Sequence, residues 1–230
     1  MKIKSALMTQ ASGSIAGMTA AHNRGGLYLR ARSIPVNTNT TQQQAIRSIM
    51  SSTVAAWGDT LTDAQRSAWG EYGAAVGTVN SFGDTIPLSG IAAYVQANVP
   101  RIQAGLTRVD DGPTTYSLPD FGGITDVAAS EATQGLLLSF DDSYPWVDFD
   151  DTGLIVQVSR PQNATINYFN GPYRFAALVE GSTTAPPTSP AAITAPFPFV
   201  AGQKLFVRVR YSTAAGRLSS AARSFCVAAA

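Results

Sequence analysis

Acidic side chains are absent from the first 58 residues of the sequence, although this stretch carries six basic residues. The six are Lys2, Lys4, Arg24, Arg30, Arg32 and Arg47. Large apolar residues are scarce before Ile46, so the stretch cannot bury enough surface to offset the entropy that it loses on ordering. We therefore expect residues 1–40 to form an extended basic arm that becomes ordered against a partner.

Charge is segregated along the rest of the 230-residue chain as well. Residues 59–158 hold three arginines against fourteen acidic residues, whereas residues 159–230 hold seven basic residues and a single acid, Glu180. Blocks of opposite sign favour head-to-tail contact between identical subunits. Segments that fold independently and merely differ in composition would give the same pattern, so both interpretations stay open.

Short β-compatible runs at residues 17–22 and 27–33 flank the sequence Asn23-Arg24-Gly25-Gly26, whose glycines suit a tight turn. This predicts a small hairpin that ends near Pro35. The polar stretch from Asn37 to Thr40 is then expected to be a connector.

Residues 41–112 carry the signals of three helices. Thr41-x-x-Gln44 and Thr62-x-x-Gln65 have the spacing of capping boxes, and Ser89 could cap a third helix that Pro100 kinks or ends. Apolar residues recur at helical spacing after each signal; in the first helix they are Ile46, Met50, Val54 and Trp57, in the second Trp69, Tyr72 and Val76, and in the third Ile91, Tyr94, Val95, Val99 and Ile102. These patterns predict a small helical bundle with Trp57 and Trp69 in its core.

Beyond residue 112 the pattern changes to short apolar or alternating runs separated by turn residues, which is typical of an all-β sandwich. Five strands are predicted, at Leu136–Phe140, Gly153–Ser159, Arg174–Val179, Lys204–Tyr211 and Arg223–Val227. The proline-rich stretch 181–198 is expected to be a long loop or an edge. The predicted fold class is therefore α+β, with an arm and hairpin at 1–40, a helical domain at 41–112 and an immunoglobulin-like or fibronectin-like sandwich at 113–230.

The acid-rich loop 141–151 is the one segment whose composition suits a hard cation such as Ca²⁺, which takes six to eight oxygen ligands. Its acids lack the regular spacing of known calcium loops, so a solvated loop or a polar interface is favoured and no metal or cofactor is expected. Tyr144 and Trp146 lie between acidic residues that include Asp148 and Asp150. This arrangement makes the loop a candidate for binding a ligand or a protein.

Nothing in the sequence supports an enzyme, because the common phosphate-binding, nucleotide-binding, zinc-protease and serine-hydrolase motifs are missing. His22 is the sole histidine and lies in the predicted arm, and Cys226 is the sole cysteine, so it cannot form an intramolecular disulfide. The arm has few arginines and one aromatic residue among them, Tyr28, so specific nucleic-acid recognition is not expected. No signal peptide or membrane span is apparent, which predicts synthesis in the cytoplasm.

A group of poorly characterised structural proteins of tailed phages and prophages has a glycine-rich hairpin, a connector and a helical pair with two tryptophans. Residues 12–106 resemble this group in Ser12-Gly-Ser-Ile-Ala-Gly17, His22-Asn-Arg-Gly-Gly26, Tyr28-x-Arg30-x-Arg32, Pro35-x-Asn37, Thr40-Thr-Gln42, Arg47, Trp57 and Leu61-Thr-x-x-Gln-Arg66-x-x-Trp69. The connector here, Asn37-Thr38-Asn39-Thr40, lacks the usual proline. The resemblance implies membership of a virion and no catalytic residue.

Two classes of function are therefore expected. The first is a virion structural protein, such as a head decoration, minor capsid or head-tail joining subunit, that forms a homo-oligomer in the particle and contacts the major capsid, portal or neighbouring proteins. Its assembly arm would use Arg24, Tyr28, Arg30 and Arg32. The second is an adhesion or carbohydrate-binding module that uses Tyr144 and Trp146 as a sugar platform.

Overall fold

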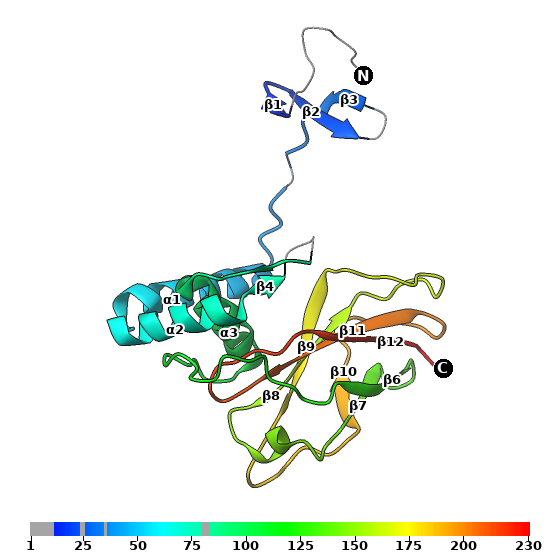
Figure 1. Ribbon diagram of the computed structural model, residues 1–230. Helices are drawn as coiled ribbons and strands as arrows, with labels where there is room; N and C mark the ends of the chain where they lie inside the picture. Colours follow the sequence, from blue (N-terminus) through cyan, green and yellow to red (C-terminus); the bar gives the residue numbers. More distant parts are fainter. Residues whose placement is uncertain (1–11, 24–25, 35, 80–82) are drawn as a thin grey trace. The chain divides into compact units, whose positions relative to one another are not determined.

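The computed structural model describes residues 12–23, 26–34, 36–79 and 83–230 (Figure 1). Contacts divide the chain into two compact units, Met1–Thr41 and Gln42–Ala230. The described part is a mixed structure of three α-helices and four antiparallel sheets. None of its helices has the length and apolar character needed to cross a bilayer.

The first unit is a three-stranded antiparallel sheet in the order β1-β2-β3. Its strands are β1 (Gly13–Ile15), β2 (Met18–Asn23) and β3 (Gly26–Ala31). The predicted hairpin is confirmed as β2 and β3, although the turn residues 24–25 lie outside the described residues. Strand β1, which was not predicted, pairs Ser14 with Thr19.

The second unit begins with α1 (Thr41–Asp59), α2 (Asp63–Val76) and α3 (Gly90–Ala104), with the short strands β4 (Thr78–Val79) and β5 (Thr85–Ile86) between α2 and α3. The capping box of α2 is confirmed, since the Thr62 N–H donates to Gln65 Oε1 at 2.8 Å and the Gln65 N–H donates to Thr62 Oγ1 at 3.3 Å. Ser89 caps α3, and that helix continues past Pro100. Helix α1 includes Thr41 as its first residue, so Thr41 does not cap it from outside.

The helical core forms around Trp69 and Tyr94, which are fully buried and lie 5.5 Å apart between ring centroids. Trp57 packs against this core but remains half-buried. The sequence predicted that one apolar face of α1 is buried. This prediction is wrong for the middle of the helix, because Met50 and Val54 are 45% and 41% exposed. Helix α1 therefore presents an open apolar stripe.

Seven strands follow the helices: β6 (Ile124–Ser130), β7 (Gly135–Phe140), β8 (Gly153–Ser159), β9 (Tyr173–Glu180), β10 (Ala191–Thr194), β11 (Lys204–Ser212) and β12 (Ala222–Val227). They form two antiparallel sheets, in the orders β10-β7-β6 and β12-β11-β8-β9. All five predicted strands are present to within one residue. Strand β6 was not predicted, and β10 is an edge strand inside the proline-rich stretch.

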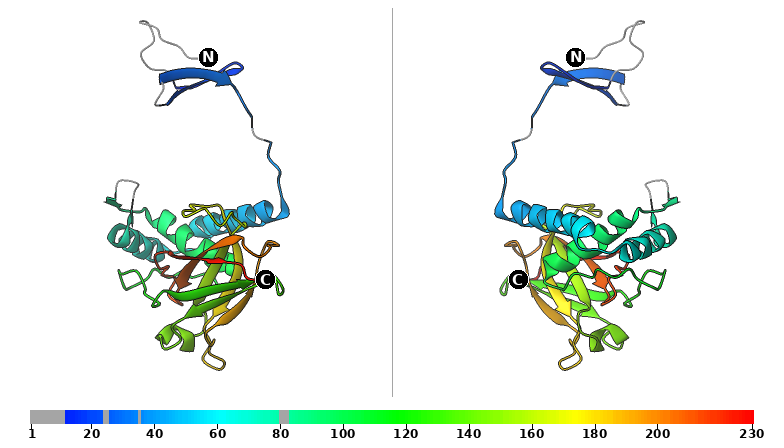
Figure 2. Two further views of the ribbon diagram at one scale, coloured as in Figure 1. Left: turned by 90° about the vertical axis from the view of Figure 1, so that its right-hand side faces the viewer. Right: turned by 90° about the vertical axis from the view of Figure 1, so that its left-hand side faces the viewer.

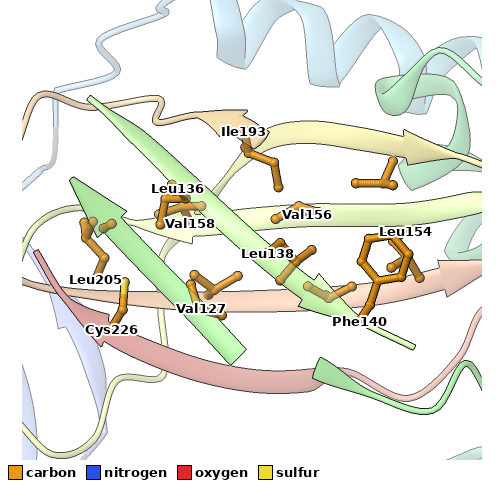
Figure 3. Close-up of a cluster of buried hydrophobic side chains, with 14 of the residues drawn as sticks. Val127, Leu136, Leu138, Phe140, Leu154, Val156, Val158, Ile193, Leu205 and Cys226 are labelled. Carbon is orange, nitrogen blue, oxygen red and sulfur yellow. The ribbon is translucent and has the colours of Figure 1, made fainter. Parts of the chain in front are cut away.

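The inner faces of these two sheets enclose the main hydrophobic core (Figure 3). Leu136 and Leu138 of one sheet point toward Val156 and Val158 of the other, and all four are almost completely buried. Alternation explains the arrangement, because successive side chains of a strand point to opposite faces of the sheet. In β11, for example, Leu205, Val207 and Val209 are buried between Lys204, Arg208 and Arg210 in the sequence.

The expected domain boundary at residues 112 and 113 does not separate compact units, since Gln42–Ala230 form one unit. The three helices lie together beside the C-terminal strands (Figures 1 and 2). Arg101 of α3 is fully buried and donates hydrogen bonds to Ser212 Oγ at 2.8 Å and Asp151 Oδ2 at 2.7 Å. Its Nε donates to the Thr107 carbonyl at 3.0 Å, just after α3, while its two terminal nitrogens are bonded by the β region. This buried cation therefore ties the helices to the β region.

Candidate functional site

The arm sheet has two different faces because its strands alternate. The register places Arg30 opposite Thr19 and Tyr28 opposite Ala21 on one face. Ser14 extends this row on β1, where its hydroxyl lies 2.7 Å from that of Thr19. Two of the predicted assembly residues, Tyr28 and Arg30, are therefore adjacent on a polar face.

The opposite face of the same sheet carries Ile15, Met18, Leu27 and Leu29, and it is exposed where β1 pairs with the start of β2. Ile15 pairs with Met18 there, and their exposed fractions are 85% and 46%. Leu27 is the one buried side chain among the described residues of this unit. A three-stranded sheet is stable by itself only when an apolar face is packed, and the part of this face formed by Ile15 and Met18 is not packed.

Of the remaining predicted arm residues, the structure describes Arg32, which lies just beyond the end of β3. Its backbone N–H donates to the Gly17 carbonyl at 2.8 Å, while its side chain is exposed. Arg24 lies outside the described residues, so its place is not assigned.

The second candidate, the loop between β7 and β8, differs from the expectation. Trp146 is only 2% exposed; its ring lies 5.4 Å from that of Phe140 and 6.0 Å from that of Tyr211. Tyr144 is half-buried and packs on Gly122, where an added Cβ would lie 2.5 Å from the ring. The predicted exposed aromatic pair is wrong, because a 3₁₀ turn at Pro145–Asp148 directs Trp146 into the core.

Two carboxylates of this loop accept hydrogen bonds from nearby loop residues, one of them across to the loop after β9. Asp150 accepts hydrogen bonds from the Thr183 N–H and hydroxyl, both at 2.9 Å, and these bonds lower the pKa of Asp150 below its ordinary value. Asp141 accepts from Ser143 in the same way, with its pKa lowered by the same cause. Asp148 is exposed. Within the described residues no three His, Cys, Asp or Glu side chains are grouped so that they could hold a metal ion.

Arg101 is a buried polar residue that the sequence patterns did not single out. Its guanidinium donates to the Thr213 carbonyl at 2.6 Å as well as to Asp151 and Ser212. Burial lowers its pKa, and the carboxylate of Asp151 opposes that shift. The one signal in the sequence is that Arg101 falls three residues after Asn98 and seven after Tyr94, on the face of α3 that is buried.

The sole cysteine and the sole histidine of the chain lie far apart in the sequence and in different environments. Cys226 is buried in the core, and this burial raises the pKa of its thiol to about 11, which keeps it protonated and unreactive. His22 is exposed on β2 opposite Leu27.

The chain matches no family model, no curated protein and no solved structure. The candidate site therefore rests on geometry. Its best-defined feature is the two-faced, nearly coreless sheet of the arm.

Proposed function

We propose that this chain is a non-enzymatic structural subunit of a bacteriophage virion that assembles through its N-terminal arm. In this role the arm sheet lies against a neighbouring subunit or another virion protein, such as the major capsid or portal protein. The resemblance of residues 12–106 to tailed-phage structural proteins suggests the particle, and the chemistry of the arm suggests how the subunit joins it.

The observation that carries the proposal is the open apolar face of the arm sheet. Ile15 and Met18 remain exposed there, and Leu27, on the same face, is the single buried side chain among the described residues of the sheet. Apolar area that is exposed in the subunit gains about 25 cal/mol per Å² when a partner covers it. Tyr28 and Arg30 on the other face are residue types that are enriched at protein interfaces.

Helix α1 supports the same interpretation. It continues the acid-free stretch as far as Gly58, and its exposed Met50 and Val54 form an apolar stripe next to Arg47 in the sequence. Apolar residues flanked by basic ones suit a partner whose surface is acidic around an apolar centre.

We also propose that the C-terminal strands form an immunoglobulin-like or fibronectin-like sandwich. Three strands in the order β10-β7-β6 face four in the order β12-β11-β8-β9, as in the three-plus-four arrangement of fibronectin type III modules. Such a module suits the part of a subunit that projects or packs laterally.

The alternative function, an adhesion or carbohydrate-binding module, depends on Tyr144 and Trp146. Because Trp146 is buried in the core and Tyr144 is half-buried on Gly122, the loop offers no pair of exposed rings on which a sugar could stack.

Deletion of residues 1–36 tests the assembly role. The shortened chain is expected to remain folded and soluble but to be missing from purified particles of a phage whose own copy of the gene carries the deletion. Mass spectrometry of the particles measures its copy number. Incorporation of the shortened chain at the full-length level would overturn the proposal.

A matched pair of variants separates the arm surface from general charge effects. Arg30→Ala combined with Arg32→Ala removes two exposed arm cations and is expected to lower incorporation. Arg160→Ala removes an exposed cation of the second unit and should leave incorporation unchanged. Equal effects of the two changes would contradict a specific role of the arm.

A further inference from the structure

The outer face of the four-stranded sheet carries a cluster of arginines. Arg208 and Arg210 of β11 point away from the core, because Val207 and Val209 fill the alternate, buried positions. Arg223 of β12 lies directly opposite Arg208 in the register of the two strands. Like charges at directly opposed positions destabilise a sheet, so the folded subunit alone does not explain this pair.

No carboxylate balances these three arginines among the described residues, whose ion pairs are Arg66–Asp63, Arg101–Asp151 and Arg108–Asp110. Nε of Arg210 is buried without a hydrogen-bond partner. Desolvation lowers the pKa of Arg210, and the neighbouring Arg208 and Arg223 lower it further. The exposed Arg223 and the half-buried Arg208 therefore have unsatisfied capacity to bind carboxylate groups, whereas the buried Nε of Arg210 is out of reach of a partner.

Neighbouring side chains fix the position of Arg208. Its Nε and Nη2 donate to Gln157 Oε1 at 2.8 and 2.5 Å, and its guanidinium lies 4.8 Å from the centre of the Tyr173 ring. A guanidinium that is held in place loses little conformational entropy when it binds, which favours a specific protein contact.

Stacking of nucleic-acid bases on this face is disfavoured, because Tyr173 and Phe206 are already engaged. Phe225, opposite Phe206, is the ring that remains 54% exposed, and Lys204 Nζ lies 4.6 Å from its centre. Tyr173 lies under Arg208, and Phe206 is buried under Phe169 with their centroids 5.5 Å apart and their planes 19° apart. Single-stranded nucleic acids are bound chiefly on aromatic rings that are free to stack. A protein surface that presents carboxylates is the better match.

The chain itself carries such a surface. Asp141, Asp142 and Asp148 are exposed in the loop between β7 and β8, and none of them pairs with a basic side chain of the described residues. The loop belongs to the acidic block 59–158, and the arginine face belongs to the basic block 159–230. Neither surface neutralises its charges within its own subunit, although each complements the other.

From this complementarity we infer that the arginine face, formed by Arg208, Arg210 and Arg223, binds the acidic loop 141–148 of a second copy of the chain. The contact joins two different surfaces, so it is heterologous and propagates from copy to copy as a ring or a row. It requires no arm, and it therefore goes beyond the assembly role proposed above.

Sedimentation velocity of the full chain at about 10 mM and about 1 M salt tests this contact, because salt screens exposed charges. At low salt the average mass is expected to rise with protein concentration, and at high salt the chain should sediment as a monomer. A chain that stays monomeric at low salt throughout the concentration series would overturn the inference.

Two charge-reversed variants identify the surfaces. The first variant alters the basic face and combines Arg208→Glu with Arg223→Glu. The second alters the acidic loop and combines Asp141→Lys with Asp148→Lys. Each variant alone should associate with itself at least about tenfold more weakly than the original chain. Arg223→Glu alone replaces the first variant if the loss of Arg208 unfolds the sheet. Arg160→Glu and Asp59→Lys are the matched controls, since both side chains are exposed outside the two surfaces.

Mixing variants distinguishes a heterologous contact from a symmetric one. Arg223→Glu and Asp148→Lys, each weakly associating alone, should form assemblies larger than a dimer when they are mixed in equal amounts. The altered residues then face each other with opposite charges, and the unaltered face and loop of the two variants meet as in the original chain. A two-fold symmetric contact would instead stop at a dimer. Association that persists unchanged in both variants would overturn the inference. These association measurements do not depend on whether the arm-deleted chain enters particles. The inference about the arginine face and the proposed assembly role of the arm can therefore fail independently of each other.

Discussion

Residues 13–31 and residues 124–227 both fold into short antiparallel strands, but they differ in what covers their apolar faces. The C-terminal sheets enclose a core of twenty buried residues, whereas the described part of the arm sheet buries Leu27 alone. Alternating sequence and turn residues are enough to specify strands in both regions. A second layer is what stabilises one of them, and we propose that the arm sheet obtains that layer from another molecule.

Trp146→Ala should produce the largest loss of stability, because it removes the biggest aromatic side chain from the enclosed core. We expect the free energy of unfolding to fall by about 4 kcal/mol, measured by urea denaturation. Phe149→Ala, in the same loop at an exposed position, is the control and should change it by less than about 0.5 kcal/mol. Similar effects of the two changes would contradict the burial of Trp146.

Arg101→Ala should rank second, at about 3 kcal/mol, since Asp151 then loses its cation and the helices lose their tie to the strands. Separate melting of the helical and β regions is the expected sign, visible as two transitions in calorimetry. Arg66→Ala supplies the comparison, because it removes a half-buried arginine that is paired with the exposed Asp63 and bonded to the Leu61 carbonyl within the helical region alone. An equal cost for both changes would contradict the tie.

Thr62→Ala removes one end of the capping box of α2 and tests a purely local contribution. Loss of the cap should lower the free energy of unfolding by about 1 kcal/mol. Thr62→Ser keeps the hydroxyl and should restore most of this loss. Failure of serine to do so would mean that the methyl group, rather than the cap, accounts for the effect.

Leu27→Ala should have the smallest effect on the isolated chain, below about 0.5 kcal/mol in the main unfolding transition, because Gln42–Ala230 carry that transition. In the matched variant Leu138→Ala, the same change in the C-terminal core should cost about 3 kcal/mol. A large effect of Leu27→Ala would show that the arm sheet already shares in the stability of the free subunit.

Local patterns in the sequence predicted the parts of this fold that depend on neighbouring residues. The capping box at Thr62 and the alternation from Lys204 to Tyr211 each reflect contacts along one element or across one pair of faces. The same patterns failed where a distant segment decides the outcome. Arg101 is buried because it meets Asp151, which lies fifty residues later in the chain.

The two errors at the candidate sites have the same physical cause. Acidic neighbours suggested that Trp146 is exposed, but a 3₁₀ turn points its ring inward while Asp148 stays outside. The spacing of Met50 and Val54 suggested burial, but no element of the described residues covers that stripe of α1 enough to bury it. Composition along the chain does not reveal which face of an element has a neighbour.

Hydrogen–deuterium exchange of the isolated subunit and of assembled particles tests most directly whether the arm sheet depends on a partner. We expect the amides of β2 and β3 to exchange quickly in the free subunit, close to unprotected rates, while β8 and β11 are protected. In particles, exchange in β2 and β3 should slow by at least about tenfold. Protection of β2 and β3 in the free subunit as strong as that of β8 and β11, and unchanged in particles, would contradict the account.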